Sequence, residues 1–330
     1  MSYYLEDGSL KKLDIKKDGS FIVNLEGRQN IIPFTENRSF LQEITASSLP
    51  KIENLSKFLS AYKNLQKAKL DLSEVTKYCN QLFYNCTSLE KLELNAPNVT
   101  SAEDMLYNSQ NLIYAKINMP KLEIANSMFH YSGVKNTDID MDMSNIKQAY
   151  LMFESCKNIT KVFDTPNIEN ATSMYRGTGI KEVTATYDKL IEASVMFHDC
   201  PELVSANIKL PKVTYADGFF HSCILLNSVE LDMPEATTIR SIVEDCTKLT
   251  KITLNIPKIT ILEDAFMNCF SLRFIDLSSI TNPEIIKSYS SCFNGVKNCT
   301  VKCTQAFKDF CLANKTDMAL DDSVTFDVID

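Results

Sequence analysis

The chain has 330 residues, of which 45% are hydrophobic and 23% are charged, and its net charge at pH 7 is −8. These fractions exclude a mainly disordered chain, and the acidic balance argues against nucleic acid as a partner. No apolar run reaches the roughly 18–20 residues that span a bilayer, and the N-terminus lacks the apolar stretch of a secretory signal. We therefore expect no membrane insertion, and a cytoplasmic or virion-associated location unless a leader was removed.

The first segment, residues 1–33, carries two apolar runs on either side of Asp18 and Gly19. Asp-Gly between such runs is a hairpin signal, so we predict an N-terminal strand or hairpin cap. The open end of a stacked array exposes apolar core and an unpaired strand edge, which this cap would cover.

A repeat with a period close to 23 residues fills residues 34–303. Most copies have an apolar anchor pair with Cys or a small hydroxyl residue four positions after the anchor, as in LFYNC, MFESC and MLYNS. Successive anchors lie 22 to 24 residues apart, which predicts an array of about eleven to twelve repeats. The pattern L-x-x-L-x-L begins seven residues after the anchor, as in Leu249, Ile252 and Leu254.

Within one repeat, the alternating part of L-x-x-L-x-L predicts a short strand with one buried face, which the following proline ends. The segment A-x-x-M-F-x-x-C places apolar residues at i, i+3, i+4 and i+7, which predicts a short helical turn. One unit cannot bury its own apolar face, so neighbouring units must stack. We therefore predict an α/β solenoid with a parallel sheet on the concave side and short helical turns on the convex side.

The strand motif, the period and the Cys-closed anchor together resemble the BspA-like leucine-rich repeat family of bacterial surface proteins. The resemblance covers roughly residues 34–303, and the preference for Met-Phe at the anchor departs from the commoner form. It implies a leucine-rich repeat arc used for binding, without naming a partner, because a fold does not fix a function.

The last segment, residues 304–330, contains TQAFKDFCLANK, which predicts a helix, and SVTFDVID, which predicts a final strand. We expect these two elements to form a C-terminal cap. Because the array and its caps use essentially the whole chain, we expect no independent catalytic domain.

Most of the eleven cysteines share one repeat position, four residues after the anchor. Free Cys behaves as a small buried apolar residue, and Ser109, Ser132 and Thr178 replace it in other copies. We therefore interpret this column as packing rather than as metal or redox chemistry. Its members are Cys86, Cys156, Cys200, Cys223, Cys246, Cys269 and Cys292.

The three histidines, His130, His198 and His221, share the position two residues after the anchor. A metal pair on the adjacent repeats of His198 and His221 would use a common ligand type, but the sequence indicates no third ligand. Tyr, Glu and Arg fill this position elsewhere, so we interpret it as solvated and predict no metal site and no cofactor. The chain also lacks GxSxG, HExxH, Walker A and GxGxxG motifs, so we predict that it is not an enzyme.

The outward positions of the predicted strands form the surface where we expect binding. Acidic and basic side chains balance there, which argues against a phosphate-tracking groove and favours a protein or glycan ligand. Four lysines would form a basic cluster on three neighbouring repeats, and three aromatic side chains would act as anchors. The predicted binding face consists of Lys67, Lys69, Lys91, Glu93, Tyr114, Lys116, Asp138, Asp140, Phe163 and Phe274.

These features predict a non-enzymatic leucine-rich repeat module that mediates protein–protein or protein–glycan interaction, as in adhesion. The alternative is a structural or receptor-binding component of a phage virion or another assembly. A homo-oligomer is compatible with either function.

Overall fold

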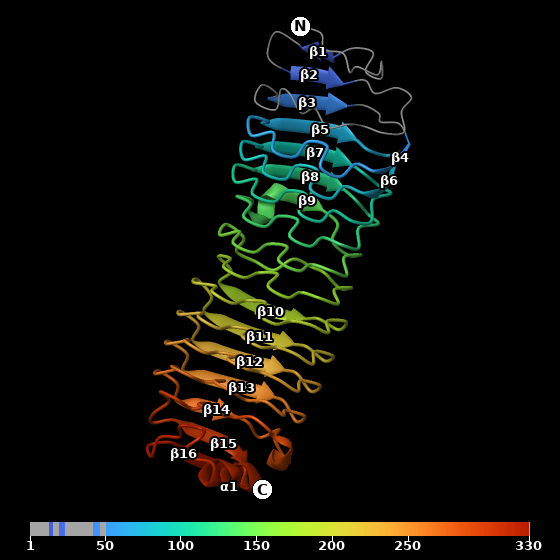
Figure 1. Ribbon diagram of the computed structural model, residues 1–330. Coiled ribbons are helices and arrows are strands. Elements are labelled where there is room, and N and C mark those ends of the chain that lie inside the picture. Colours follow the sequence, from blue (N-terminus) through green and yellow to red (C-terminus); the bar gives the residue numbers. More distant parts are fainter. Residues whose placement is uncertain (1–12, 16–19, 24–41, 47–50, 330) are drawn as a thin grey trace. The chain divides into compact units, whose positions relative to one another are not determined.

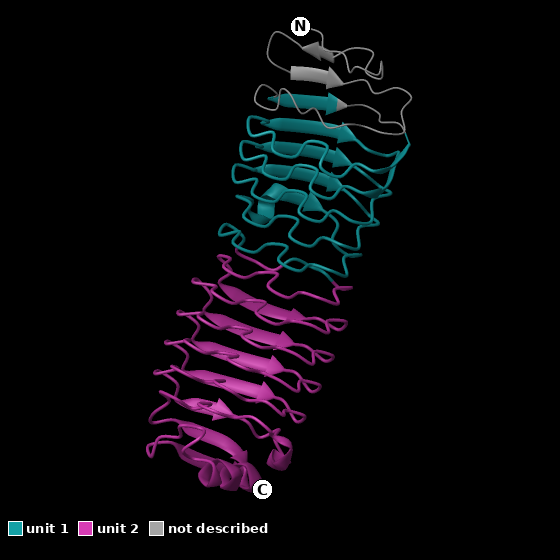
Figure 2. Ribbon diagram, in the orientation of Figure 1, with its two compact units in different colours: residues 1–159, 163–165 teal, residues 160–162, 166–330 magenta. Residues whose placement is uncertain are grey.

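The computed structural model describes residues 13–15, 20–23, 42–46 and 51–329. It divides into two compact units, with residues 1–159 and 163–165 in unit 1 and residues 160–162 and 166–330 in unit 2 (Figure 2). Each unit is a stack of short strands joined by turns (Figure 1).

The main sheet of unit 1 has seven strands in the order β1-β2-β3-β5-β7-β8-β9. β1 and β2 pair antiparallel, whereas the later neighbours pair parallel. The turn between β1 and β2 and the rest of the predicted N-terminal cap lie outside the described residues. The strands are β1 (Leu13–Ile15), β2 (Ser20–Val23), β3 (Glu43–Ala46), β5 (Lys67–Asp71), β7 (Lys91–Asn95), β8 (Tyr114–Asn118) and β9 (Ile139–Met141).

The sheet of unit 2 also has seven strands, and their order in space follows the sequence. Every neighbouring pair is parallel, and residues one repeat apart face each other, as Val229 faces Ile252. The strands are β10 (Glu182–Thr186), β11 (Ser205–Lys209), β12 (Ser228–Asp232), β13 (Lys251–Asn255), β14 (Phe274–Asp276), β15 (Thr300–Thr304) and β16 (Thr325–Ile329).

The C-terminal segment of unit 2 contains α1 (Gln305–Ala313), and β16 extends the sheet beside β15. The Thr304 hydroxyl caps α1 by accepting a hydrogen bond from the Phe307 N–H, and α1 buries Phe307 and Cys311. In the described part of the chain α1 is the only α-helix, and no helix there is long and apolar enough to cross a membrane.

The predicted short helical turns are wrong, because the anchor segments form consecutive tight turns instead. In residues 102–109, Met105, Tyr107 and Ser109 donate their N–H groups to carbonyls three residues earlier, each at 3.2 Å. The N–H groups that alternate with these three bond outside the segment, so the i→i−4 ladder of an α-helix cannot form. They run from Asp104, Leu106 and Asn108 to the carbonyls of Asn126, Met128 and His130 in the next repeat, at 2.8–2.9 Å.

A second line of parallel pairing accompanies these turns in unit 1. β4 (Ile52–Asn54) pairs with β6 (Val75–Tyr78), and single bridges continue this line through Ser101, Ile124 and Gln148. The turns therefore carry hydrogen bonds between repeats on the side of the chain where the sequence predicts helices.

The inward strand positions and the anchor pairs form the core of each unit. In β12, Val229 and Leu231 are buried, while Glu230 between them is exposed, as the period of two predicts. All eleven cysteines are free and buried, and six of the seven in the repeat column donate Sγ–H to a backbone carbonyl, as Cys156 does to Phe129 at 2.9 Å. This placement agrees with the packing interpretation.

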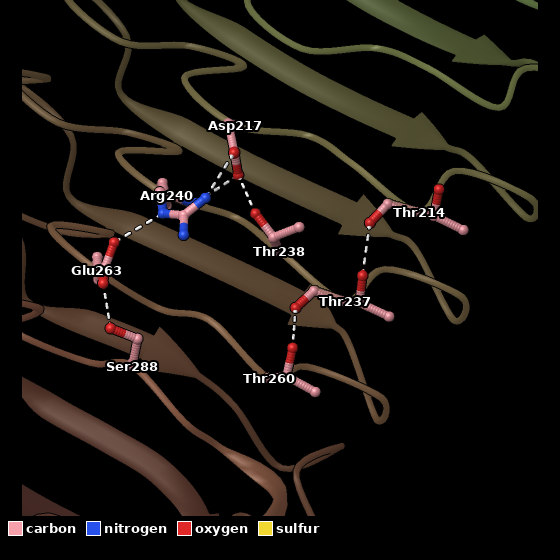
Figure 3. Close-up of polar contacts among 8 residues, drawn as sticks. All are labelled: Thr214, Asp217, Thr237, Thr238, Arg240, Thr260, Glu263 and Ser288. Atoms are coloured by element: carbon pink, nitrogen blue, oxygen red, sulfur yellow. Dashed lines mark hydrogen bonds and ion pairs between the residues drawn. The ribbon is translucent and has the colours of Figure 1, made fainter.

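Polar side chains at equivalent positions also join the repeats of unit 2 (Figure 3). The Arg240 guanidinium lies 3.5 Å from the Asp217 carboxylate and 2.7 Å from the Glu263 carboxylate, which also accepts a hydrogen bond from Ser288. Nearby, the hydroxyls of Thr237 and Thr260 donate to the backbone carbonyls of Thr214 and Thr237. These two series of contacts, which we call polar ladders, lie near the surface. We therefore expect each ion pair in them to contribute little stability.

Candidate binding face

A hollow of about 800 Å³ lies over the C-terminal halves of the strands of unit 1. Four residues of the predicted binding face line it, one from each of four neighbouring strands. They are Lys69 on β5, Glu93 on β7, Lys116 on β8 and Asp140 on β9. The complete lining is Thr45, Lys69, Leu70, Asp71, Glu93, Leu94, Asn95, Lys116, Ile117, Asn118, Asp140, Met141 and Asp142.

The four predicted residues form one row of alternating charge across the sheet. The strand register places Lys69 opposite Glu93, Glu93 opposite Lys116, and Lys116 opposite Asp140. The Lys69 ammonium lies 2.6 Å from the Glu93 carboxylate, and this hydrogen bond raises the pKa of Lys69. Glu93 therefore lies between Lys69 and Lys116, so the two lysines of this row are not direct neighbours.

A second row, called the amide row here, runs beside the charged row and consists of Asp71 and the amides of Asn95 and Asn118. Asp71 faces Asn95, which faces Asn118, because these residues end the equivalent strands β5, β7 and β8. The Asn95 amide donates to Asp71 at 2.9 Å, and the Asn118 amide donates to Asn95 at 2.7 Å. These side chains lie on the predicted face but are absent from the predicted binding residues. Their signal is an Asp or Asn at the fifth position of the three consecutive strands β5, β7 and β8.

Lys67, Lys91 and Tyr114 form a third row at the start of the same strands. Lys67 pairs with Glu43 on β3, which offsets part of the repulsion between the two lysines. Tyr114 is 39% exposed and ends this row as an aromatic surface two residues from Lys116.

Two predicted face residues do not present their side chains as expected. Asp138 belongs to a 3₁₀ helix, η1 (Asn136–Asp138), and its carboxylate accepts a hydrogen bond from the Lys135 N–H at 2.9 Å. The Phe163 ring stacks on the buried Phe153 ring, with 4.8 Å between the centroids.

Phe163 packs against the core instead of facing outward, and the neighbouring residue Asp164 explains why. A regular repeat would place the Asp164 carboxylate in the core, where an unpaired charge is costly. In the structure no strand forms over residues 160–164, Asp164 is exposed and Phe163 is half-buried. The remaining predicted aromatic, Phe274, lies half-buried on β14 of unit 2, with the Lys251 ammonium 5.7 Å from its ring centroid.

Comparison with known proteins identifies the repeat. The family described as BspA type leucine rich repeat region matches residues 53–175 and 171–300, in 6 copies. The chain belongs to this family. The resemblance inferred from the strand motif and the period is thereby confirmed, while no curated protein matches the chain.

Three solved structures are similar to this chain. A leucine-rich repeat protein from Bacteroides ovatus is 15% identical, with a TM-score of 0.54 over 100% of this chain and 98% of that one. A leucine rich cell surface protein from Faecalibacterium prausnitzii is 17% identical, with a TM-score of 0.45 over 100% and 95%. The pneumococcal vaccine antigen PcpA is 14% identical, with a TM-score of 0.48 over 100% and 99%. At these identities the likeness concerns the fold alone.

Proposed function

We propose that the chain is a non-enzymatic binding module and that the hollow of unit 1 holds a neutral glycan. The observation that carries this proposal is the charged row Lys69–Glu93–Lys116–Asp140, whose ammonium and carboxylate groups alternate across neighbouring strands. Sugar hydroxyl groups both donate and accept hydrogen bonds, so they match a surface on which donors and acceptors alternate.

The amide row supports the same ligand class. Asn95 and Asn118 each offer one donor and one acceptor, and the ladder between them holds the amides in fixed orientations. The hollow also contains Asp71 and Asp142, so its net charge is not positive and a polyanion would be repelled. Tyr114, beside the row, offers a ring face to the apolar face of a sugar.

The double variant Lys116→Ala/Asn118→Ala is expected to weaken glycan binding by at least about tenfold. Two hydrogen bonds to the ligand, one of them charge-assisted, together contribute about 1.4 kcal/mol or more. A glycan array identifies the ligand, and titration of that glycan by calorimetry measures the change in affinity.

The matched control is Asn207→Ala/Lys209→Ala on β11 of unit 2. These residues occupy the same two strand positions with the amide and the ammonium exchanged, and both are exposed. Equal binding by Lys116→Ala/Asn118→Ala and the wild type would exclude the hollow as the site. The array can show no glycan binding while the wild type captures a protein that Lys116→Ala/Asn118→Ala does not capture. In that case the ligand of this face is a protein and not a glycan.

A further inference from the structure

The histidine column of unit 2 brings together more metal-binding groups than the sequence indicates. His198 and His221 occupy adjacent repeats, and their ring centroids lie 4.7 Å apart. Glu244 holds the same position in the following repeat, and Asp245 follows it in the chain. Stacking by one repeat therefore places two carboxylates beside the His221 imidazole.

The distances define a compact donor set. His221 Nε2 lies 3.5 Å from Asp245 Oδ2, and one donor atom from each of His221, Glu244 and Asp245 lies within 4.8 Å of the others. Two ligands of a tetrahedral Zn²⁺, bound at about 2.0–2.2 Å, are roughly 3.3–3.6 Å apart. The His221–Asp245 pair already has this separation, and all three side chains are half-buried at the surface, where a rotation can close the remainder.

His198 adds a second imidazole with an unsatisfied nitrogen. Its Nδ1 is buried and has no hydrogen-bond partner, while its Nε2 lies 3.7 Å from the Asp199 carboxylate.

We propose that His221, Glu244 and Asp245, which lie beside the His198 ring, form a binding site for a divalent first-row transition metal such as Zn²⁺. Imidazole nitrogens with carboxylate oxygens suit zinc and its neighbours, whereas Ca²⁺ and Mg²⁺ are bound by oxygen ligands. A metal here would join consecutive repeats of unit 2 and stabilise their stacking.

The same column in unit 1 offers an internal contrast. His130 Nε2 lies 3.3 Å from the Glu154 carboxylate, but the neighbouring rings are those of Tyr107 and Tyr131. Among the residues that the structure describes, a group of three close metal-binding side chains is found at His221 and not at His130. His130 therefore provides a matched control for the loss of one surface histidine.

The test is titration of the full chain with ZnCl₂ at pH 7.5 by isothermal calorimetry. We expect one saturable equivalent, with affinity reduced at least about tenfold by His221→Ala and by the isosteric Asp245→Asn. His130→Ala should bind like the wild type. Circular dichroism of each variant shows whether it is folded. If His221→Ala does not fold, Asp245→Asn still tests the site.

Two results would overturn the metal site. One is the absence of saturable binding, or binding that survives both substitutions. The other is a thiolate charge-transfer band in the absorption spectrum of the Co²⁺-loaded protein, because that band would assign the metal to cysteines. A Co²⁺ spectrum with nitrogen and oxygen ligands, lost in Asp245→Asn, supports the proposal independently of any glycan binding.

Discussion

Replacing Phe197 with alanine is expected to lower the free energy of unfolding of unit 2 by about 3–5 kcal/mol. The Phe197 ring is fully buried and lies 5.5 Å from the Tyr175 ring and 5.5 and 5.7 Å from the rings of Phe219 and Phe220. Truncation leaves a cavity among rings that belong to neighbouring repeats, which the stack cannot close without shifting its backbone. Urea denaturation followed by circular dichroism measures the loss.

Arg240→Ala in the same unit is the control for this substitution. It removes the ion pairs with Asp217 and Glu263, but the Arg240 side chain is 46% exposed and fills no part of the core. We expect a loss below about 1 kcal/mol, because exposed ion pairs gain little over their hydration. A larger loss for Arg240→Ala than for Phe197→Ala would mean that polar ladders, rather than ring packing, hold the repeats together.

The stacking of the repeats could be predicted because two independent periods agree in the sequence. Alternation in L-x-x-L-x-L fixes which strand residues face inward, and the period of 23 fixes which residues are neighbours. Ile252 is therefore buried and opposite Val229, one repeat earlier. The alternating row on the sheet follows from the same register, which places Glu93 between Lys69 and Lys116.

The turns, the Phe163 side chain and the carboxylates near His221 could not be predicted in the same way. Apolar residues at i, i+3, i+4 and i+7 also fit consecutive tight turns whose alternate N–H groups bond to the next repeat. The choice depends on the neighbouring repeat, which supplies carbonyls such as that of Met128 to Leu106. The sequence does not indicate Asp245 as a metal ligand, because it lies one residue outside the histidine column and only the stacking of repeats brings it to His221.

The buried thiols predict a loss of stability at alkaline pH. Burial raises the pKa of the Cys79, Cys86 and Cys156 thiols of unit 1 to about 12, against roughly 8.5 in an unfolded chain. The stabilisation is complete below the unfolded pKa and is lost as pH rises toward the folded pKa, because the unfolded chain ionises first. Each thiol then lowers the free energy of unfolding by up to about 1.4 kcal/mol per pH unit.

Cys156→Ser isolates this effect from the titration of lysines and tyrosines. Ser132 fills the same position in the preceding repeat, where its hydroxyl donates to the Ser109 carbonyl at 3.2 Å, so serine fits the column. Urea denaturation at pH 8.5 and at pH 10 should show that the variant loses roughly 1.5 kcal/mol less than the wild type between the two pH values. Equal losses would mean that Cys156 ionises in the folded protein as readily as in the unfolded chain, and the column would then be open to solvent rather than packed in the core.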